Sequence, residues 1–478
     1  MGKITSVTRP LCRAVVVCGL VGGAMTALAP LAEASGGGTL YVNASTGHDT
    51  GTCRLSSQPC ATISYALSVA TPNATIRVAA GDYPQPLTIT QPVMISGNGD
   101  GATGSSPTVI DPSTLASDTD SDNGLAQAPI IDILNTTGVA LKGLDIKGDN
   151  AQGQFNSCAV DFVGVYYHNS SGSMDNVQVT GIELPSMLFG CQAGNAVFVR
   201  SDSGYTASVS MTGLRISSFQ KNGIICRDEG TSCTVSHSDV TGIGPNAQIA
   251  PNGIEAYNVS SITISHSSVS DNSYTGGEAD YQAAGLLILD VGTVSVTHCT
   301  LSDNDVNAYV GSDETGPSEG TWTISGNTVT GATDNVPGGS PGNGYGDGID
   351  LDSTINGSVS ISDNSVSGSA EYGIALTGAS YATVSGNKVT GNASDGIYIG
   401  GPGGAATSSS SNAITSNRST SNGGDGIHAD TDSNNNTFSD NYTHQNGLYD
   451  LQDAGSSNSW SGNTCSPAND SRPAGLCS

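Results

Sequence analysis

The sequence predicts an all-β fold: a right-handed parallel β-helix, in which short strands coil and stack into a solenoid. Three observations support this prediction. A motif of a polar residue, a glycine and an aliphatic residue recurs along the chain, apolar residues alternate with polar ones around it, and asparagine-bearing turns follow most copies. Alternation with period two is typical of strands, and self-similarity at a period of roughly 20 to 50 residues is typical of solenoids.

The recurring motif sets the length of one coil. Its copies are Asn222-Gly223-Ile224, Asn252-Gly253-Ile254, Ala284-Gly285-Leu286, Asp347-Gly348-Ile349, Tyr372-Gly373-Ile374, Asp395-Gly396-Ile397 and Asp425-Gly426-Ile427. From Gly348 to Gly373 to Gly396 the period is 23 to 25 residues, which fits a coil of three short strands. Because parallel strands stack about 4.8 Å apart, we expect Ile and Val to form ladders inside the coil and Asn to form ladders at the turns.

The N-terminal residues 1–34 predict a signal peptide. A basic segment is followed by an apolar run and a small-x-small cleavage site, namely Lys3, Arg9 and Arg13, then 14–29, then Ala32-Glu33-Ala34. The apolar run is shorter than the about 20 residues that span a bilayer, and no later segment is apolar enough. We therefore expect a secreted, extracellular protein without a membrane partner, whose residues 35–478 form one β-helix domain.

Both ends of the solenoid need a cap, because a terminal coil leaves its core open on one side. Residues 61–70 place Ile63, Ala66, Leu67 and Ala70 at helical spacing, which predicts a short amphipathic capping helix. Residues 449–478, which contain Trp460, predict the C-terminal cap. The polar, acid-rich segment 111–128 predicts a mobile insertion.

Cysteine usage agrees with export. The pairs Cys53 and Cys60, Cys226 and Cys233, and Cys465 and Cys477 are near neighbours, Cys158 and Cys191 could close a longer loop, and Cys299 is left over and expected in a buried strand. An oxidising compartment favours disulfides for such pairs. Zinc is disfavoured, because no Cys-x-x-Cys pair occurs and the spacings differ. The pairing itself stays a prediction.

The charge is strongly negative, with 42 acidic against 14 basic residues and a net charge of −28. This charge balance disfavours a nucleic-acid partner, since phosphate binding requires clustered Lys and Arg. Two interpretations of the acidity stay open. It keeps an exported monomer soluble, or its carboxylates bind Ca²⁺.

The run Tyr41-Val42-Asn43, then Cys60-Ala61-Thr62-Ile63 and Ala79-Ala80-Gly81-Asp82-Tyr83, followed by the glycine–aliphatic coils, resembles bacterial secreted right-handed β-helix repeat proteins of the pectate-lyase-like superfamily. The resemblance covers nearly the whole mature chain and implies the fold. That superfamily holds lyases, hydrolases, epimerases, phage tailspikes and non-catalytic surface proteins, so the resemblance implies no single chemistry.

The densest group of candidate site residues is Asp347, Asp350 and Asp352. In each glycine–aliphatic strand the aliphatic side chain points inward and its neighbours point outward, so Asp350 and Asp352 face the exterior. Three carboxylates this close repel one another unless a cation or shared protons relieve the repulsion. We expect these three to bind calcium. In the alternative, Asp347 serves the turn, as Asp395 and Asp425 are expected to do.

Two motifs carry a more specific resemblance. Gly346-Asp347-Gly348-Ile349-Asp350-Leu351 is similar to the Asp-Asp-Gly-Trp-Asp-Leu calcium motif of the lysine-base pectate lyases, and Asp395-Gly396-Ile397-Tyr398-Ile399-Gly400-Gly401 is similar to their Asn-Gly-Phe-Lys-Leu-Gly-Gly strand. Tyr398 stands where those enzymes have the catalytic lysine, and Gly346 replaces one aspartate. His428 projects from the next coil, about 5 Å away, and titrates in the range that suits acid–base catalysis. In the alternative, Tyr398 and His428 are ordinary surface residues.

Three functions stay open. The preferred one is a polysaccharide lyase on a uronic-acid-containing polymer, with Tyr398, His428, Asp350 and Asp352 as catalytic residues. The second is a non-catalytic extracellular protein that binds glycans or the cell wall. The third is a two-carboxylate glycoside hydrolase, although the Gly-His-Gly and Arg-Ile-Lys motifs of polygalacturonases are missing from the sequence. In all three the partner is an extracellular polysaccharide.

Overall fold

The computed structural model of the chain describes residues 37–99, 106–117, 121–122, 125–276, 283–312, 320–333, 346–352, 358–401, 408–466 and 470–478. The chain divides into two units, Met1–Ser35 and Gly36–Ser478. The predicted signal peptide, 1–34, lies outside the described residues. Of the helices that the structure describes, none has the length and apolar character needed to cross a membrane.

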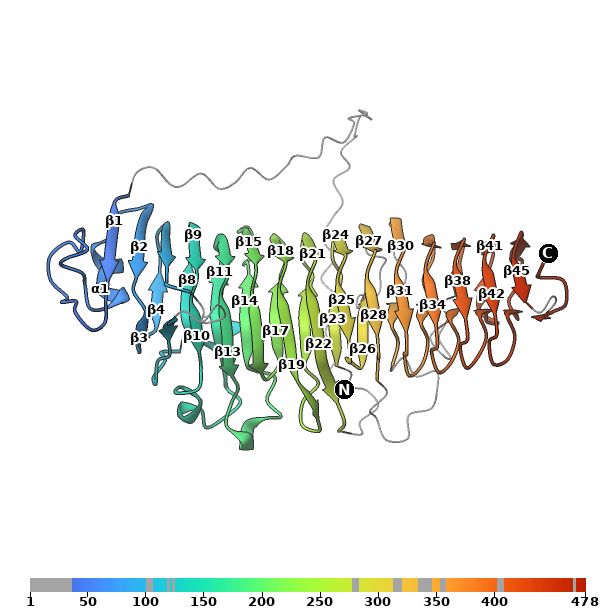
Figure 1. The fold of residues 1–478 in the computed structure, drawn as a ribbon, viewed down its shortest axis with the longest axis horizontal. Coiled ribbons are helices and arrows are strands. Elements are labelled where there is room, and N and C mark those ends of the chain that lie inside the picture. Colours follow the sequence, from blue (N-terminus) through green and yellow to red (C-terminus); the bar gives the residue numbers. More distant parts are fainter. Residues whose placement is uncertain are drawn as a thin grey trace, which may run out of the picture. The chain divides into compact units, whose positions relative to one another are not determined.

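Nearly all of the strands that the structure describes belong to three parallel sheets, which the chain visits in turn on every coil. Figure 1 shows the strands stacked side by side in chain order, from the N-terminal coil in blue to the C-terminal coil in red. We number the sheets 1, 2 and 3 in the order in which the first full coil enters them.

Sheet 1 contains β1 (Thr39–Val42), β2 (Ala74–Val78), β5 (Val93–Ser96), β9 (Thr137–Lys142), β12 (Ser171–Asp175), β15 (Ala207–Thr212), β18 (Thr231–Ser236), β21 (Ser261–Ser265), β24 (Thr293–Thr297), β27 (Thr321–Ser325), β30 (Ser358–Ser362), β33 (Ala382–Ser385), β37 (Ala413–Thr415), β41 (Thr437–Ser439) and β44 (Ser459–Ser461).

Sheet 2 contains β3 (Gly81–Tyr83), β6 (Thr108–Ile110), β10 (Asp145–Lys147), β13 (Gln178–Ile182), β16 (Arg215–Phe219), β19 (Asp239–Asn246), β22 (Ser268–Tyr274), β25 (Thr300–Ser302), β28 (Thr328–Thr330), β31 (Ser365–Ser367), β34 (Lys388–Thr390), β38 (Arg418–Thr420), β42 (Tyr442–His444) and β45 (Thr464–Ser466).

Sheet 3 contains β4 (Leu87–Ile89), β8 (Leu125–Leu134), β11 (Val160–His168), β14 (Asn195–Arg200), β17 (Asn222–Arg227), β20 (Asn252–Tyr257), β23 (Ala284–Leu289), β26 (Val306–Gly311), β29 (Ile349–Asp352), β32 (Ile374–Thr377), β35 (Ile397–Gly400), β39 (Ile427–Ala429), β43 (Leu451–Asp453) and β46 (Ser471–Arg472). The short β7 (Ser121–Asp122) pairs antiparallel with β8, and β36 (Ser409–Ser410) pairs with β40 (Ser433–Asn434).

The core lies inside the coil and is built from the inward positions of each strand. In sheet 3 the parallel register aligns Ile349 with Ile374, and Ile374 with Ile397. All three side chains are buried. The predicted alternation with period two is therefore confirmed. The side chain of one residue points into the core, and the side chain of the next points to the outer face.

An asparagine ladder closes the turn between sheets 1 and 2 and confirms the prediction of stacked turn amides. Its members are Asn327, Asn364, Asn387, Asn417, Asn441 and Asn463, all buried. The side chain of Asn387 is representative. Its Nδ2 donates to Asn417 Oδ1 and to the Ile361 carbonyl, each at 2.9 Å. Its Oδ1 accepts from the Nδ2 and the backbone N–H of Asn364, at 3.0 and 2.9 Å.

The N-terminal end carries the helix that the sequence predicted within 61–70. Helix α1 spans Ile63–Val69, and the Thr62 hydroxyl caps it by accepting from the Tyr65 N–H at 3.1 Å. Ile63 and Ala66 are buried, and α1 packs against β1, β2 and β4. Two further single turns of 3₁₀-helix are η1 (Gln152–Gln154) and η2 (Ser186–Leu188).

Two predicted segment boundaries need correction. The C-terminal boundary of the mobile insertion expected over 111–128 is wrong. Strand β8 begins at Leu125, and its Ala128 is buried opposite Phe162 of β11. The C-terminal cap expected over 449–478 contains a further coil, because Leu451 continues the inward row in register with Ile427. The cap features are still present: Trp460 stacks on Phe438 with 3.9 Å between ring centroids.

All four predicted cysteine pairs are disulfides, namely Cys53–Cys60, Cys158–Cys191, Cys226–Cys233 and Cys465–Cys477. Cys299 is free and buried, as predicted. It lies in the turn after β24 rather than in a strand, where its backbone N–H donates to Asn327 Oδ1 at 2.8 Å. Cys299 thus takes the place of an asparagine at the N-terminal end of the ladder.

We predict that Asn387→Ala destabilises the fold by about 3 kcal/mol, because it leaves several buried polar groups of the neighbouring coils without partners. The midpoint of urea-induced unfolding measures the loss. The matched control is Lys388→Ala at the next, exposed position, which should change stability by less than about 0.5 kcal/mol. Equal effects of the two substitutions would contradict a stabilising role for the ladder.

Candidate functional site

The outward face of sheet 3 brings the predicted site residues into two neighbouring rows. The parallel register places Tyr309, Asp350, Ala375, Tyr398 and His428 side by side on β26, β29, β32, β35 and β39. A second row runs through the turn that precedes each of these strands, and it holds Asp347, Tyr372, Asp395 and Asp425. Successive members of a row are one strand apart, about 4.8 Å.

His428 is held by an aspartate from the preceding coil. Its Nδ1 lies 2.8 Å from Asp395 Oδ2 and 3.6 Å from Asp425 Oδ2. Its Nε2 lies 3.0 Å from Gln452 Nε2. Since an amide nitrogen only donates, His428 Nε2 accepts this bond and Nδ1 carries the proton that it donates to Asp395. The carboxylate thus fixes the tautomer in which Nε2 carries the lone pair, and the Gln452 amide donates to this lone pair.

The charges around His428 shift its titration. Burial lowers its pKa, but the hydrogen bond to Asp395 and the charges of Asp395, Asp425 and Asp430 outweigh burial and raise it above the usual value. Burial and the charge of Asp395 raise the pKa of Asp425 to about 6. We call Tyr398, His428, Asp395, Asp425 and Asp430 the C-terminal cluster.

Tyr398 lies beside His428 and keeps its proton. Its hydroxyl donates to Asp430 Oδ2 at 2.9 Å, and its ring meets the His428 ring edge-on with 5.6 Å between centroids. Burial, together with the hydrogen bond to Asp430 and its charge, raises the pKa of Tyr398 well above the usual value. On its other side Tyr398 stacks on Tyr372 at 4.5 Å. A phenol held in this way is a proton donor.

The predicted calcium residues Asp347, Asp350 and Asp352 lie two strands from Tyr398. Asp347 Oδ1 accepts from the Tyr372 backbone N–H at 2.8 Å, and Asp350 Oδ1 accepts from Thr377 Oγ1 at 2.6 Å. The hydroxyl of Tyr309 donates to Asp352. Asp347 and Asp350 are both buried.

Burial and neighbouring charge favour the protonated form of two of these carboxyls. Burial and the charge of Glu371 raise the pKa of Asp347 well above its usual range. Burial and the charges of Asp347 and Asp352 do the same for Asp350. The repulsion that the sequence predicted is therefore present, and shared protons are one of the two means of relieving it.

A metal-ligand arrangement occurs at a different place from the predicted one. Asp395, Asp425 and His428 each offer a ligand atom, and these atoms lie within 4.8 Å of one another. Among the described residues no such group is formed by Asp347, Asp350 and Asp352. A nitrogen and two carboxylates suit a transition-metal ion, whereas calcium takes oxygen ligands alone.

Sequence reasoning missed the partners of His428 and Tyr398. Asp395 and Asp425 were expected to serve the turn, and they do: Asp395 Oδ1 accepts the Asp425 N–H at 2.5 Å, and Asp425 Oδ1 accepts the Tyr449 N–H at 2.7 Å. Their second oxygens face His428. The sequence signal that could have indicated these partners is a repeated spacing. Asp425 precedes His428 by three residues, and Asp395 precedes Tyr398 by three.

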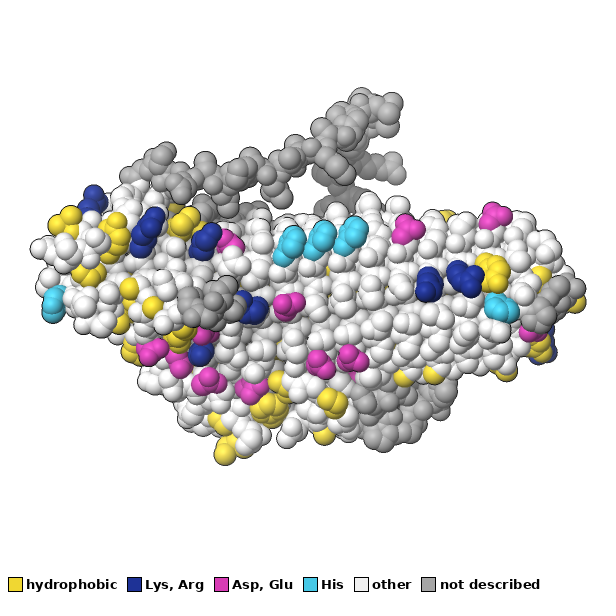
Figure 2. Space-filling model, in the orientation of Figure 1, with side chains coloured by type: hydrophobic (Ala, Val, Ile, Leu, Met, Phe, Trp, Pro, Cys, Tyr) yellow, Lys and Arg dark blue, Asp and Glu magenta, His cyan; other side chains and the backbone are white. Residues whose placement is uncertain are grey.

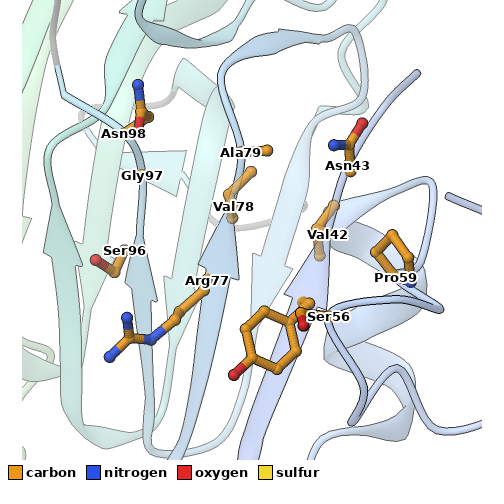
Figure 3. Close-up of a pocket in the computed structure, with 11 residues that line it drawn as sticks. Val42, Asn43, Ser56, Pro59, Arg77, Val78, Ala79, Ser96, Gly97 and Asn98 are labelled. Atoms are coloured by element: carbon orange, nitrogen blue, oxygen red, sulfur yellow. The ribbon is translucent and has the colours of Figure 1, made fainter. Parts of the chain in front are cut away.

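The N-terminal half of the same face is closed by apolar side chains. Tyr166, Phe198 and Ile225 occupy the outward row there and are buried. One cavity, of about 290 Å³, lies elsewhere, on the first coils of sheet 1. Figure 3 shows Arg77 extending from β2 toward β5, which carries Ser96, while Asn43 and Asn98 lie at the other end of the cavity. In the outward row of sheet 3, Tyr398 and His428 therefore lie on the C-terminal coils, away from this cavity and from the apolar side chains.

Residues 284–470 match the family model described as the right-handed β-helix region. The chain is a right-handed parallel β-helix protein. This agrees with the fold predicted from the repeats and with the resemblance to β-helix repeat proteins. No protein of curated function matches the sequence of this β-helix protein.

Solved structures share the fold at low sequence identity. The catalytic unit of a GH87 α-1,3-glucanase from Streptomyces thermodiastaticus is 16% identical with a TM-score of 0.50, over 76% of this chain and 60% of that one. The periplasmic alginate epimerase AlgG is 11% identical with a TM-score of 0.47, over 82% and 77%. The GH136 lacto-N-biosidase from Eubacterium ramulus is 11% identical with a TM-score of 0.46, over 88% and 65%.

We predict that Asp395→Asn lowers the pKa of His428, because it removes the hydrogen bond and the nearest charge that raise it. Proton NMR titration of the imidazole measures the shift. Because the folded pKa of His428 lies above that of an unfolded histidine, the pair stabilises the fold at low pH and loses this effect as pH rises through the folded pKa. Asp352→Asn on β29 is the control and should leave the His428 titration unchanged.

Proposed function

We propose that this β-helix protein is an extracellular polysaccharide lyase whose acid–base pair is His428 and Tyr398. The observation that carries the proposal is the fixed pair of His428 and Asp395 next to the protonated phenol of Tyr398. A β-elimination on a uronic acid polymer needs a base for the C5 proton and an acid for the leaving oxygen at C4. The two groups stand on adjacent strands of one sheet, where His428 is half-buried and Tyr398 is buried.

The geometry supports a separate role for each of the two groups. His428 Nε2, with Nδ1 held by Asp395, takes the C5 proton. Tyr398, whose raised pKa keeps it protonated, donates to the glycosidic oxygen as the C4–O bond breaks and the C4–C5 double bond forms. Asp430 accepts the Tyr398 hydroxyl hydrogen bond and orients it. Proton transfer by positioned groups contributes roughly 100-fold to 10,000-fold to such a rate.

The substrate carboxylate needs a neutralising partner. The outward positions described on β26 to β39 carry no Lys or Arg. Arg472, exposed on β46, aligns with Gln452, the residue that bonds His428. We assign the charge of Arg472 to this task. The neutral Gln452 amide would donate a hydrogen bond to the substrate carboxylate in place of His428 Nε2, which frees the Nε2 lone pair for the C5 proton. No step requires calcium, and calcium at Asp347, Asp350 and Asp352 stays a separate proposal that added Ca²⁺ with an EDTA-treated control tests.

The fold and the disulfides support an extracellular polysaccharide as the class of substrate. Four disulfides agree with an oxidising, exported location. The glucanase that shares the fold cleaves a polysaccharide, as its name states. A linear polymer also suits a face made of parallel rows, because successive sugar units can follow successive strands.

We predict that the protein releases unsaturated products from a uronic-acid polymer and that His428→Asn and Tyr398→Phe each lower kcat by about 100-fold or more. Ultraviolet absorbance of the double bond measures the products, on pectate, alginate and other uronic-acid polymers. The matched controls are His48→Asn and Tyr442→Phe, which lie outside the C-terminal cluster and should keep full activity. Binding without any change in polymer length would instead support the non-catalytic glycan-binding function.

A second candidate, a two-carboxylate glycoside hydrolase, is favoured by one observation. The pKa of Asp425 is raised to about 6, whereas backbone and side-chain hydrogen bonds, against the effect of burial, lower the pKa of Asp430. Carboxyls whose pKa values are driven apart can divide the roles of acid and base. Reducing ends released without an unsaturated product, and lost in Asp425→Asn, would select this function over the lyase.

A further inference from the structure

Three histidines form an exposed row on the opposite side of the coil from the sheet 3 site, at the turn between sheets 1 and 2. His237, His266 and His298 occupy the same turn position on three successive coils. Figure 2 shows them side by side in cyan. Their rings are stacked, with centroids 5.0 and 5.1 Å apart and interplanar angles of 4° and 10°. The chain has only seven histidines, so nearly half of them stand in this one row.

Turn geometry does not require histidine at this position. All three residues have a left-handed backbone, with φ of 50°, 50° and 55°. Glycine, asparagine and aspartate adopt this conformation most readily, and the next coils use Gly326, Asp363 and Gly386 at the equivalent turn, with φ of 67°, 56° and 67°. The imidazoles therefore add a property that the turn itself does not need.

That property is a set of accessible nitrogen ligands at a regular spacing. We propose that the row binds one divalent transition-metal ion of the Zn²⁺, Cu²⁺ or Ni²⁺ class between two neighbouring imidazoles. Imidazole is a preferred ligand of these ions. All three side chains are exposed, so rotation about the Cβ–Cγ bonds turns a nitrogen of each ring toward the space between the rings.

The row makes His266 the essential ligand. His237 and His298 are two strands apart, about 9.6 Å along the stack, which exceeds the span of an ion that binds nitrogen at about 2.0 to 2.1 Å. Only the adjacent pairs, His237 with His266 and His266 with His298, can therefore hold the ion. Since a neutral imidazole binds one ion through one nitrogen, the row holds one ion at a time, and water or an external ligand completes its coordination.

Isothermal titration of Zn²⁺ into the EDTA-treated full chain without a polyhistidine tag tests the proposal. His266→Asn removes both pairs and should weaken binding at the row by at least the roughly 10-fold that loss of even an outer-shell partner costs. His237→Asn and His298→Asn each leave one pair and should keep one ion with a smaller loss. Asparagine tolerates the left-handed turn, so the fold is preserved, and circular dichroism in EDTA checks this.

Two controls separate the row from other ligands. His48→Asn removes an exposed histidine outside the row and should leave binding unchanged. His428→Asn removes the nitrogen ligand of the group formed by Asp395, Asp425 and His428. Zn²⁺ that still binds to this variant, and that no longer binds when His266→Asn is added, is therefore bound by the row. Undiminished binding in His266→Asn on the His428→Asn background would overturn the proposal, as would equal losses in all three single variants of the row.

Discussion

The parallel register between neighbouring coils is the constraint on which the rest of the structure depends. Each strand pairs with the equivalent strand of the next coil, so equivalent residues lie one strand spacing apart. The asparagine ladder enforces this register, because an amide such as Asn387 bonds the coil before it and the coil after it at once. A slip by one residue would break these bonds and turn every inward side chain outward.

The same register turns sequence repeats into functional surfaces. A residue at one position of a coil acquires neighbours from positions about 25 to 30 residues away, and these neighbours are in contact only because the coils stack. His428 meets Asp395 in this way, across 33 residues, and Tyr398 meets Asp430 across 32. The three stacked histidines arise from the same rule on another edge. A solenoid thus places equivalent side chains in linear rows along its length.

Burying carboxylates in the site costs more free energy than the composition of the chain suggests. Asp347 and Asp350 are buried side by side with Glu371 close by, and burial drives their carboxyls toward the protonated form. Asp395 uses one oxygen for a backbone N–H and the other for His428. The acidity of the chain therefore has more than one physical role, and in the C-terminal cluster it tunes a histidine.

The sequence by itself determined the fold class, the inward rows and the disulfide partners, because each depends on local periodicity or short separation. Gly348, Gly373 and Gly396 mark the coil, and Cys226 and Cys233 are seven residues apart. Tyr398 and His428 were also predicted as neighbours, since a repeat gives the register of adjacent coils. Only the tertiary structure decided what each side chain touches. The bonds of Asp395 to His428 and of Tyr398 to Asp430 depend on side-chain direction and burial, which a one-dimensional pattern does not encode.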